Sequence, residues 1–444
     1  MEIKLSDHFT FKKLLRFTAP SVVMMIFTSI YSVVDGFFVS NFVGKTPFAA
    51  VNLIMPFLSI ISTVGFMFGA GGSAVVAKKL GEGKDKEANQ NFSLFVYASF
   101  TLGVIFALLG IIFIRPISVF LGAEGEILKN CMIYGRIILA ALPFFITQML
   151  FQSFFVTAEK PKLGLFVTVT SGVCNIILDA VLVVLLPTEF KIVGAACATA
   201  VSQMVGGCFA LIYFSRKNNS ILKLGKTNFD GKAILKACTN GSSEFMSNVA
   251  MSIVSMLYNF KLLEYAGQDG VAAYGVMMYV GFIFVAVYVG YTIGVAPVIG
   301  YHDGAQNHDE LKGLLRKSLM LIGISSVIMT VSAIILASPL SKIYVGYDKE
   351  LFELTRHGFT IFSLSYLFMG YAIFGSGFFT ALNDGVTSAV ISFLRALVFQ
   401  VAAVLLLPLI FGIDGIWYSI VAAEVAAMAL SAIFLMIKKN KYHY

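Results

Sequence analysis

Residues 92–114, FSLFVYASFTLGVIFALLGIIFI, form a run without a single charged side chain. A helix rises about 1.5 Å per residue, so this run is long enough to cross the ~30 Å hydrocarbon core of a membrane. Further charge-free runs occupy residues 192–214 and 318–338. Because such runs recur along the whole chain, the sequence predicts a protein that crosses the membrane many times.

The composition agrees with this prediction, since 58% of the residues are hydrophobic and only 13% are charged. A soluble domain carries about 25% charged residues. Backbone groups in lipid must be hydrogen-bonded internally, and the apolar runs do not alternate as barrel strands do. We therefore expect an all-α integral membrane protein with twelve transmembrane helices. The expected spans are 16–41, 48–78, 92–114, 128–158, 163–187, 192–214, 233–263, 271–301, 315–338, 351–382, 386–411 and 413–437.

The basic residues predict how these helices are oriented. Twenty-two Lys and Arg residues fall on the side that carries the two termini and the central loop, and seven fall on the opposite side. Cytoplasmic loops carry the excess of Lys and Arg in membrane proteins. We expect a multi-pass protein of the cell membrane with both termini in the cytoplasm. The net charge of +8 then belongs to these loops, and nucleic acid is not an expected partner.

The two halves of the chain match one another at an offset of 223 residues. Gly81 corresponds to Gly304, Pro116 to Pro339, and Ala158 to Ala381 in this comparison, and beyond the fifth helix the offset becomes 221. Each repeat holds six helices and therefore inserts in the same direction, which predicts an axis of pseudo-symmetry along the membrane normal. The expected domains are an N-terminal six-helix lobe (1–214), a cytoplasmic linker (215–232) and a C-terminal six-helix lobe (233–444).

Two carboxylates lie within the predicted membrane spans of the N-terminal lobe. Asp35 lies ~27 Å along its helix and Asp179 ~24 Å along its own, so the two share a depth in the outer half of the membrane. Asn175 lies four residues before Asp179 and shares its helix face, and Thr199 falls at a similar depth. These oxygen atoms predict a site for a proton or a cation, with Na⁺ a candidate. The alternative is a pair of solvated carboxylates at the helix ends.

The C-terminal lobe lacks this acidic group, because the offset places Tyr258 opposite Asp35. It carries instead Glu244, Arg395 and Glu424, each ~15 Å from its helix start. A buried Arg requires a carboxylate partner, and either Glu would serve. We expect Arg395 to form an ion pair with one of them. The cluster is then either a static pair that holds the lobe together or a second site for substrate or coupling.

Several motifs give the chain a resemblance to the multidrug and toxic compound extrusion (MATE) family over essentially its full length. They are Ala19-Pro20-Ser21 with Tyr31 and Asp35, Gly81-Glu82-Gly83-Lys84, Ala158-Glu159-Lys160-Pro161, Asn175 with Asp179, Gly194 to Thr199, and Gly241-Ser242-Ser243-Glu244-Phe245.

The resemblance implies two six-helix lobes in a V shape and the export of cationic, amphipathic drugs in exchange for Na⁺ or H⁺. It also implies a cation site at Asp35, Asn175, Asp179 and Thr199 that includes the backbone carbonyl of Ala195. Some members of the family place a cation site on acids of the seventh, eighth and tenth helices. Here the eighth helix carries no acid and the tenth carries only Glu353 near its start, which argues against a cation site in the C-terminal lobe.

The leading functional hypothesis is a cation-coupled multidrug efflux antiporter that works as a monomer by alternating access. It would use H⁺ or Na⁺ as coupling ion and no cofactor. The alternative is a flippase for lipid-linked saccharides, which would require a basic cavity for the pyrophosphate. A receptor or scaffold without transport is a third hypothesis, but it gains nothing from buried carboxylates. An enzyme is not expected, because no nucleotide-binding or hydrolase motif is present.

Overall fold

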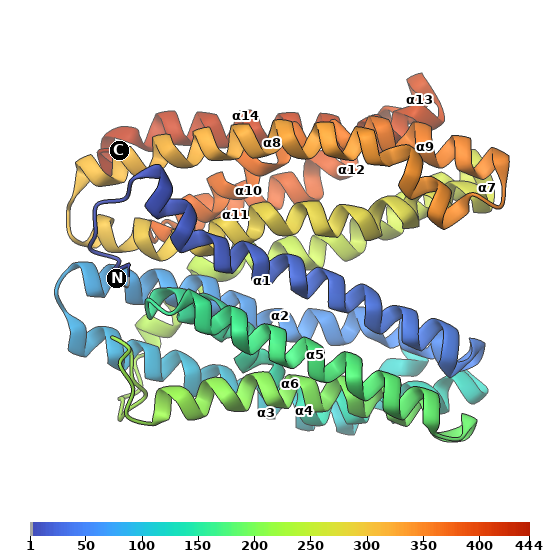
Figure 1. The fold of residues 1–444 in the computed structure, drawn as a ribbon, viewed down its shortest axis with the longest axis horizontal. Coiled ribbons are helices and arrows are strands. Elements are labelled where there is room, and N and C mark those ends of the chain that lie inside the picture. Colours follow the sequence, from blue (N-terminus) through green and yellow to red (C-terminus); the bar gives the residue numbers. More distant parts are fainter. Residues whose placement is uncertain (1–2) are drawn as a thin grey trace.

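A computed structural model describes residues 3–444, and the elements of this part of the chain are helices, with no β-strand among them (Figure 1). The N-terminal half contains α1 (Phe11–Phe38) with a π-helical end η1 (Val39–Val43), α2 (Lys45–Gly81), α3 (Asp85–Phe120), α4 (Gly125–Thr157), α5 (Pro161–Leu185), the short turn η2 (Thr188–Phe190) and α6 (Lys191–Ser215). The C-terminal half contains α7 (Gly231–Gly304), α8 (His308–Val345), α9 (Lys349–Ser363), α10 (Tyr366–Ala381), α11 (Gly385–Phe393), the π-helical turn η3 (Leu394–Phe399), α12 (Gln400–Leu406), α13 (Pro408–Phe411) and α14 (Ile413–Tyr442).

The helices of the described chain account for twelve membrane crossings. Ten are long and apolar enough as continuous spans, and α9 and α10, bent by 47° between them, together form an eleventh. The twelfth comes from α7, whose 74 residues include a break at Gly267 (φ 60, ψ −148). At ~1.5 Å per residue α7 is far too long for one crossing of a ~30 Å core, so Gly267 divides it into two. The twelve-helix fold class is thus confirmed.

Two details differ from the spans expected from the sequence. Helices extend beyond their apolar runs, as α3 does from Asp85 to Phe120, because polar ends reach the membrane surface without breaking the backbone hydrogen bonds. The expected single helix 386–411 is interrupted by the π-helical turn η3 around Arg395 and ends in the short α13. Turns of this kind occur frequently at functional sites.

The internal sequence repeat is also seen in the contacts between the two halves, which occur in equivalent pairs. A Cβ atom added to Gly81 would collide with the carbonyl oxygen of Tyr301, and one added to Gly304 would collide with that of Lys78. Positions 78 and 301, like 81 and 304, are related by the 223-residue offset. The same contact is therefore made twice with the roles exchanged, as a two-fold axis between the halves requires.

The halves share one hydrophobic core only at the end of the molecule that carries both termini (Figure 1). There Phe68 and Phe95 of the first half belong to one cluster with Val295 and Phe374 of the second. At the opposite end each half has its own core.

Two polar contacts reinforce the shared core. Lys78 Nζ of α2 lies 2.8 Å from Asp303 Oδ2 of α7, and the side-chain amide of Asn383 donates to the Ala74 carbonyl oxygen at 3.1 Å. The halves are therefore fastened together at the terminal end and packed separately at the other. This is the arrangement expected of two lobes that together form a V shape.

Candidate functional site

The structure brings together the four polar residues that the sequence placed at one depth of the N-terminal half. Asp35 comes from α1, Asn175 and Asp179 from α5, and Thr199 from α6. The side chains of the other three are the polar neighbours of the Asp35 carboxylate. The Thr199 hydroxyl lies 3.3 Å from Asp35 Oδ1 and 3.2 Å from the carbonyl oxygen of Ala195. The expected cluster is therefore assembled from three helices, including the Ala195 carbonyl.

The buried members of this cluster are short of hydrogen-bond partners. Asp179 and Asn175 are 0% and 1% exposed. Neither oxygen of Asp179 and neither polar atom of the Asn175 amide has a partner within residues 3–444. Buried polar atoms normally find a partner, and those that do not require an explanation. A proton or a cation shared by the two carboxylates would supply one.

Tyr134 of α4 is a neighbour of this cluster that the sequence argument missed. Its ring is 2% exposed, and its hydroxyl is close enough to interact with Thr199 and to feel the charge of Asp35 and Asp179. Asp35 and Asp179 stand out as charged residues inside apolar runs, whereas a tyrosine in such a run gives no such signal. The phenol brings a hydroxyl group from a fourth helix, α4, close to the site.

In the C-terminal half Arg395 forms an ion pair, as expected, and its partner is Glu424. The two nitrogen atoms Nε and Nη2 lie 2.8 and 2.9 Å from the two carboxylate oxygens, in a two-point geometry. The side chains are 17% and 3% exposed. This geometry satisfies both charges where neither has free access to water.

Glu244 differs from Glu424 because its carboxylate has no ion-pair partner within the described chain. It interacts with Arg395 only at longer range. Glu244 lines a central cavity of about 380 Å³ together with Arg395 and Glu424, in the size range of small-molecule sites. The cavity walls include Met25 and Phe66 from the N-terminal half and Met251, Met278 and Phe282 from the C-terminal half.

Tyr258, the counterpart of Asp35 in the repeat, also lines this cavity. Its hydroxyl donates to Gln400 Oε1 at 2.8 Å, and its ring stacks on Tyr274 with centroids 5.3 Å apart. The acidic cluster around Asp35 and the stacked pair Tyr258 and Tyr274 therefore occupy equivalent places in the two halves. The 223-residue offset predicts that Tyr258 corresponds to Asp35, but it does not predict that Tyr258 lines the cavity.

Comparison with known proteins agrees with this architecture. The model of the MatE family matches residues 20–181 and again residues 245–406, which together make up well over half of the chain. The chain belongs to the MatE family. This is the multidrug and toxic compound extrusion family of membrane efflux transporters, so the resemblance read from the motifs is confirmed.

The family match extends to individual proteins over nearly the whole chain. The multidrug export protein MepA of Staphylococcus haemolyticus (strain JCSC1435) is 24% identical over 97% of this chain and 94% of its own length. A MATE crystal structure in complex with MaL6 aligns with a TM-score of 0.92 at 19% identity, covering 98% of each chain. The outward-facing conformation of a multidrug resistance MATE transporter aligns with a TM-score of 0.91 at 20% identity, over 98% of this chain and 97% of that one. The relatives are transporters rather than enzymes.

The Arg395–Glu424 pair of this MatE protein leads to a prediction about stability. The variant Arg395→Met leaves the buried Glu424 carboxylate unpaired, which should lower the free energy of unfolding by about 3–5 kcal/mol. The double variant Arg395→Met/Glu424→Leu removes both charges and should recover most of that loss. Unfolding in detergent, followed by circular dichroism, measures both.

Arg356→Met is the matched control. Arg356 pairs with Glu353 at 2.7 Å, but both side chains are about half exposed, so the change should be no more than ~1 kcal/mol. Equal destabilisation by the two single variants would contradict the account of the Arg395–Glu424 pair.

Proposed function

We propose that this chain is a cation-coupled multidrug efflux antiporter. It exports amphipathic, cationic compounds by alternating access and takes up H⁺ or Na⁺ in exchange. The observation that carries this proposal is the adjacency of Asp35 to the fully buried Asp179, whose oxygens lack partners within the described chain. Acids buried at such cost inside a membrane mark ion pathways and proton relays.

The coupling follows from the repulsion between the two carboxylates. Two negative charges close together in a poorly solvated site oppose one another, so the site gains from binding one proton or one Na⁺. Asn175, Thr199 and the Ala195 carbonyl add neutral oxygens, the donors that a hard cation prefers. The donor set therefore suits Na⁺ as well as a proton, and we propose that the site accepts either.

Helix α1 is the element that can carry this event to the interface between the halves. It packs against α5 inside the N-terminal half and against α7 of the other half. Pro20 interrupts the backbone hydrogen bonds of α1 and allows a bend. We propose that ion binding at Asp35 changes the course of α1 beyond Pro20 and thereby the shape of the central cavity.

The central cavity favours a cationic, amphipathic substrate. Methionine and aromatic side chains provide an adaptable apolar wall, and Glu244 supplies a carboxyl group without an ion-pair partner among the described residues. A lipid-linked pyrophosphate would require an excess of positive charge, but the cavity's Arg395 is neutralised by Glu424. The cavity therefore supports the drug exporter over the flippase.

The direction of transport rests on the proposed orientation. The excess of Lys and Arg on its loops supports a cytoplasmic location for the terminal end. The shared core closes the halves against each other at this end, which supports a state whose cavity opens toward the outside. We further propose that the protein acts as a monomer and that the cycle uses no cofactor besides the coupling ion and the exported compound.

Removal of either buried charge should stop export. Asp35→Asn and Asp179→Asn keep the shape of the side chain but remove the repulsion that makes ion binding favourable. We expect drug efflux from cells expressing each variant at matched levels to fall below about a tenth of the wild-type rate, a change of ~1.4 kcal/mol in the barrier.

Asp269→Asn is the control, since Asp269 is exposed and lies at the same end of the molecule as the acidic cluster. It should export at the wild-type rate. Wild-type efflux in both cluster variants would rule out coupling at this site.

Glu244 should set the preference for positively charged compounds. A hydrogen bond or contact with a charged group contributes about 1.5–3 kcal/mol, so Glu244→Gln should weaken binding of tetraphenylphosphonium at least about tenfold. Binding of an uncharged aromatic dye of similar size should change little. Fluorescence or equilibrium-dialysis titration of the purified variants tests this, and equal affinity of wild type and variant for the cation would show that Glu244 does not recognise charge.

A further inference from the structure

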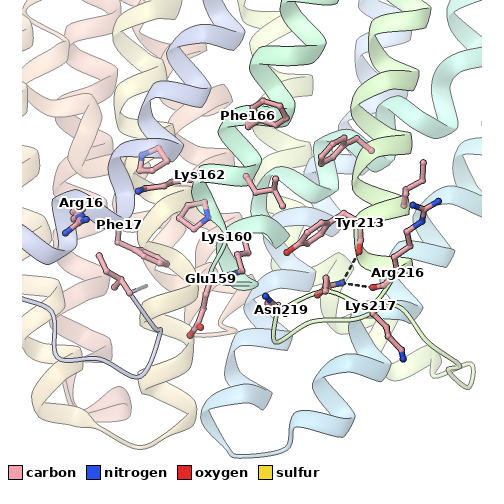
Figure 2. A pocket seen from close by; sticks show the side chains of 17 residues that line it. Arg16, Phe17, Glu159, Lys160, Lys162, Phe166, Tyr213, Arg216, Lys217 and Asn219 are labelled. Carbon is pink, nitrogen blue, oxygen red and sulfur yellow. Dashed lines mark hydrogen bonds between the residues drawn. The ribbon is translucent and has the colours of Figure 1, made fainter. Parts of the chain in front are cut away.

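A second cavity, of about 960 Å³, lies at the terminal end of the N-terminal half, apart from the central cavity and the acidic cluster. It is bounded by the start of α1, the start of α5 and the end of α6 with the loop that follows. Figure 2 shows Arg16 and Lys162 on one side of it and Arg216 and Lys217 on the other. Lys160 also lines it. We call this place the basic corner.

Four of the cations that line the basic corner have no carboxylate partner in the part of the chain that the structure describes. Within residues 3–444, Arg16, Lys162, Arg216 and Lys217 make no ion pair with a carboxylate. Glu159 is the one acid among the described residues that line the cavity, and its Oε1 accepts a hydrogen bond from the Leu5 backbone N–H at 2.6 Å. Burial raises the pKa of the Glu159 carboxyl, while the hydrogen bond from Leu5 opposes that rise.

The start of α5 adds to the positive potential. Pro161 occupies its first turn, no acid is present in that turn, and no side chain caps it. The partial positive charge of a helix N-terminus therefore remains available to an anion in the corner.

An apolar surface continues from the basic corner toward the membrane interior. Phe166 of α5 and Ile212 of α6 are 57% and 52% exposed. The ring of Phe166 meets that of Phe209 at 6.2 Å in an edge-to-face arrangement, and both rings line the cavity. Charged groups at the membrane surface with exposed aromatic and aliphatic side chains beneath them match the two parts of a phospholipid.

The equivalent corner of the C-terminal half is built differently. At the 223-residue offset Pro161 corresponds to Asp384, which caps α11 and lies 3.3 Å from Lys438 Nζ. The Tyr442 hydroxyl donates to the same carboxylate at 3.0 Å. That corner is neutralised by the chain's own C-terminal segment. A basic corner needed only for folding of the repeat would be expected in both halves.

We propose that the basic corner binds an anionic phospholipid, with the phosphate among Arg16, Lys162, Arg216 and Lys217 and the acyl chains along Phe166, Phe209 and Ile212. Basic pockets between transmembrane helices at the cytoplasmic surface bind anionic headgroups of this kind. Lipid binding at this place joins the starts of α1 and α5 to the end of α6. It does not depend on the export cycle.

Native mass spectrometry of the purified, full-length protein tests the proposal. Phosphatidylglycerol and phosphatidylcholine with identical acyl chains are offered at equal concentration in detergent. We expect the wild type to retain one phosphatidylglycerol with at least about tenfold preference. The variant Arg16→Gln/Lys162→Gln/Arg216→Gln/Lys217→Gln should lose that preference.

The matched control, Lys86→Gln/Lys312→Gln/Arg316→Gln/Lys439→Gln, removes four exposed charges from the same end of the molecule and should keep the preference. Glycerol 1-phosphate, the headgroup phosphate without acyl chains, should not displace the lipid. The glycerol 1-phosphate competition and the comparison of the two lipids require only the wild-type protein. Both therefore test the proposal even if a fourfold variant does not fold.

Three results would overturn the proposal. One is equal retention of the two lipids by the wild type, which would show no preference for the anionic headgroup. Another is equal loss of preference in both fourfold variants, which would assign the effect to overall surface charge. The last is displacement of the lipid by glycerol 1-phosphate at equal concentration, which would make the corner a site for a free anion.

Discussion

An ionised side chain inside a lipid bilayer is costly unless it is paired, hydrated or bound to a counter-ion, and this cost organises the structure. The charge of Arg395 is compensated by its two hydrogen bonds to the Glu424 carboxylate. Glu244 lies at the wall of a cavity, where a positively charged compound can provide the missing partner. Asp35 and Asp179 lie beside one another, and no cation of residues 3–444 is among the neighbours of Asp35. Glu244 and the Asp35–Asp179 pair therefore need a charged partner from outside the protein. We propose that Glu244 binds the substrate and that the Asp35–Asp179 pair binds the coupling ion.

The packing of the two halves gives these incomplete sites a way to act on each other. Close glycine contacts and one shared core hold the halves together at the terminal end, while separate cores leave them independent at the other. Contacts made twice by a two-fold axis can open and close as a unit, because packed cores have discrete arrangements. Helix α1 contacts both the acidic cluster and α7, so occupation of one site can bias the packing that governs the other.

The membrane spans and the acidic cluster of the N-terminal half could be predicted from the sequence. Charge-free runs gave the spans, and helix rise alone placed Asp35 and Asp179 at one depth because both helices start at the same membrane surface. The sequence could not choose between Glu244 and Glu424 as the partner of Arg395, since side-chain direction depends on the π-helical turn η3, which leaves no signal in hydropathy. Tyr134 was missed because it carries no charge. The basic corner draws on three separate segments that only the fold brings together.

The central claim is that movement of an ion through the N-terminal half drives the drug in the opposite direction. Purified protein in liposomes, with the membrane potential held at zero by equal K⁺ and valinomycin, allows a pH gradient and a Na⁺ gradient to be imposed one at a time. The account predicts that tetraphenylphosphonium accumulates on the side with the higher proton concentration in the first case and with the higher Na⁺ concentration in the second. If tetraphenylphosphonium is distributed equally with no gradient, with the pH gradient and with the Na⁺ gradient, the account is contradicted.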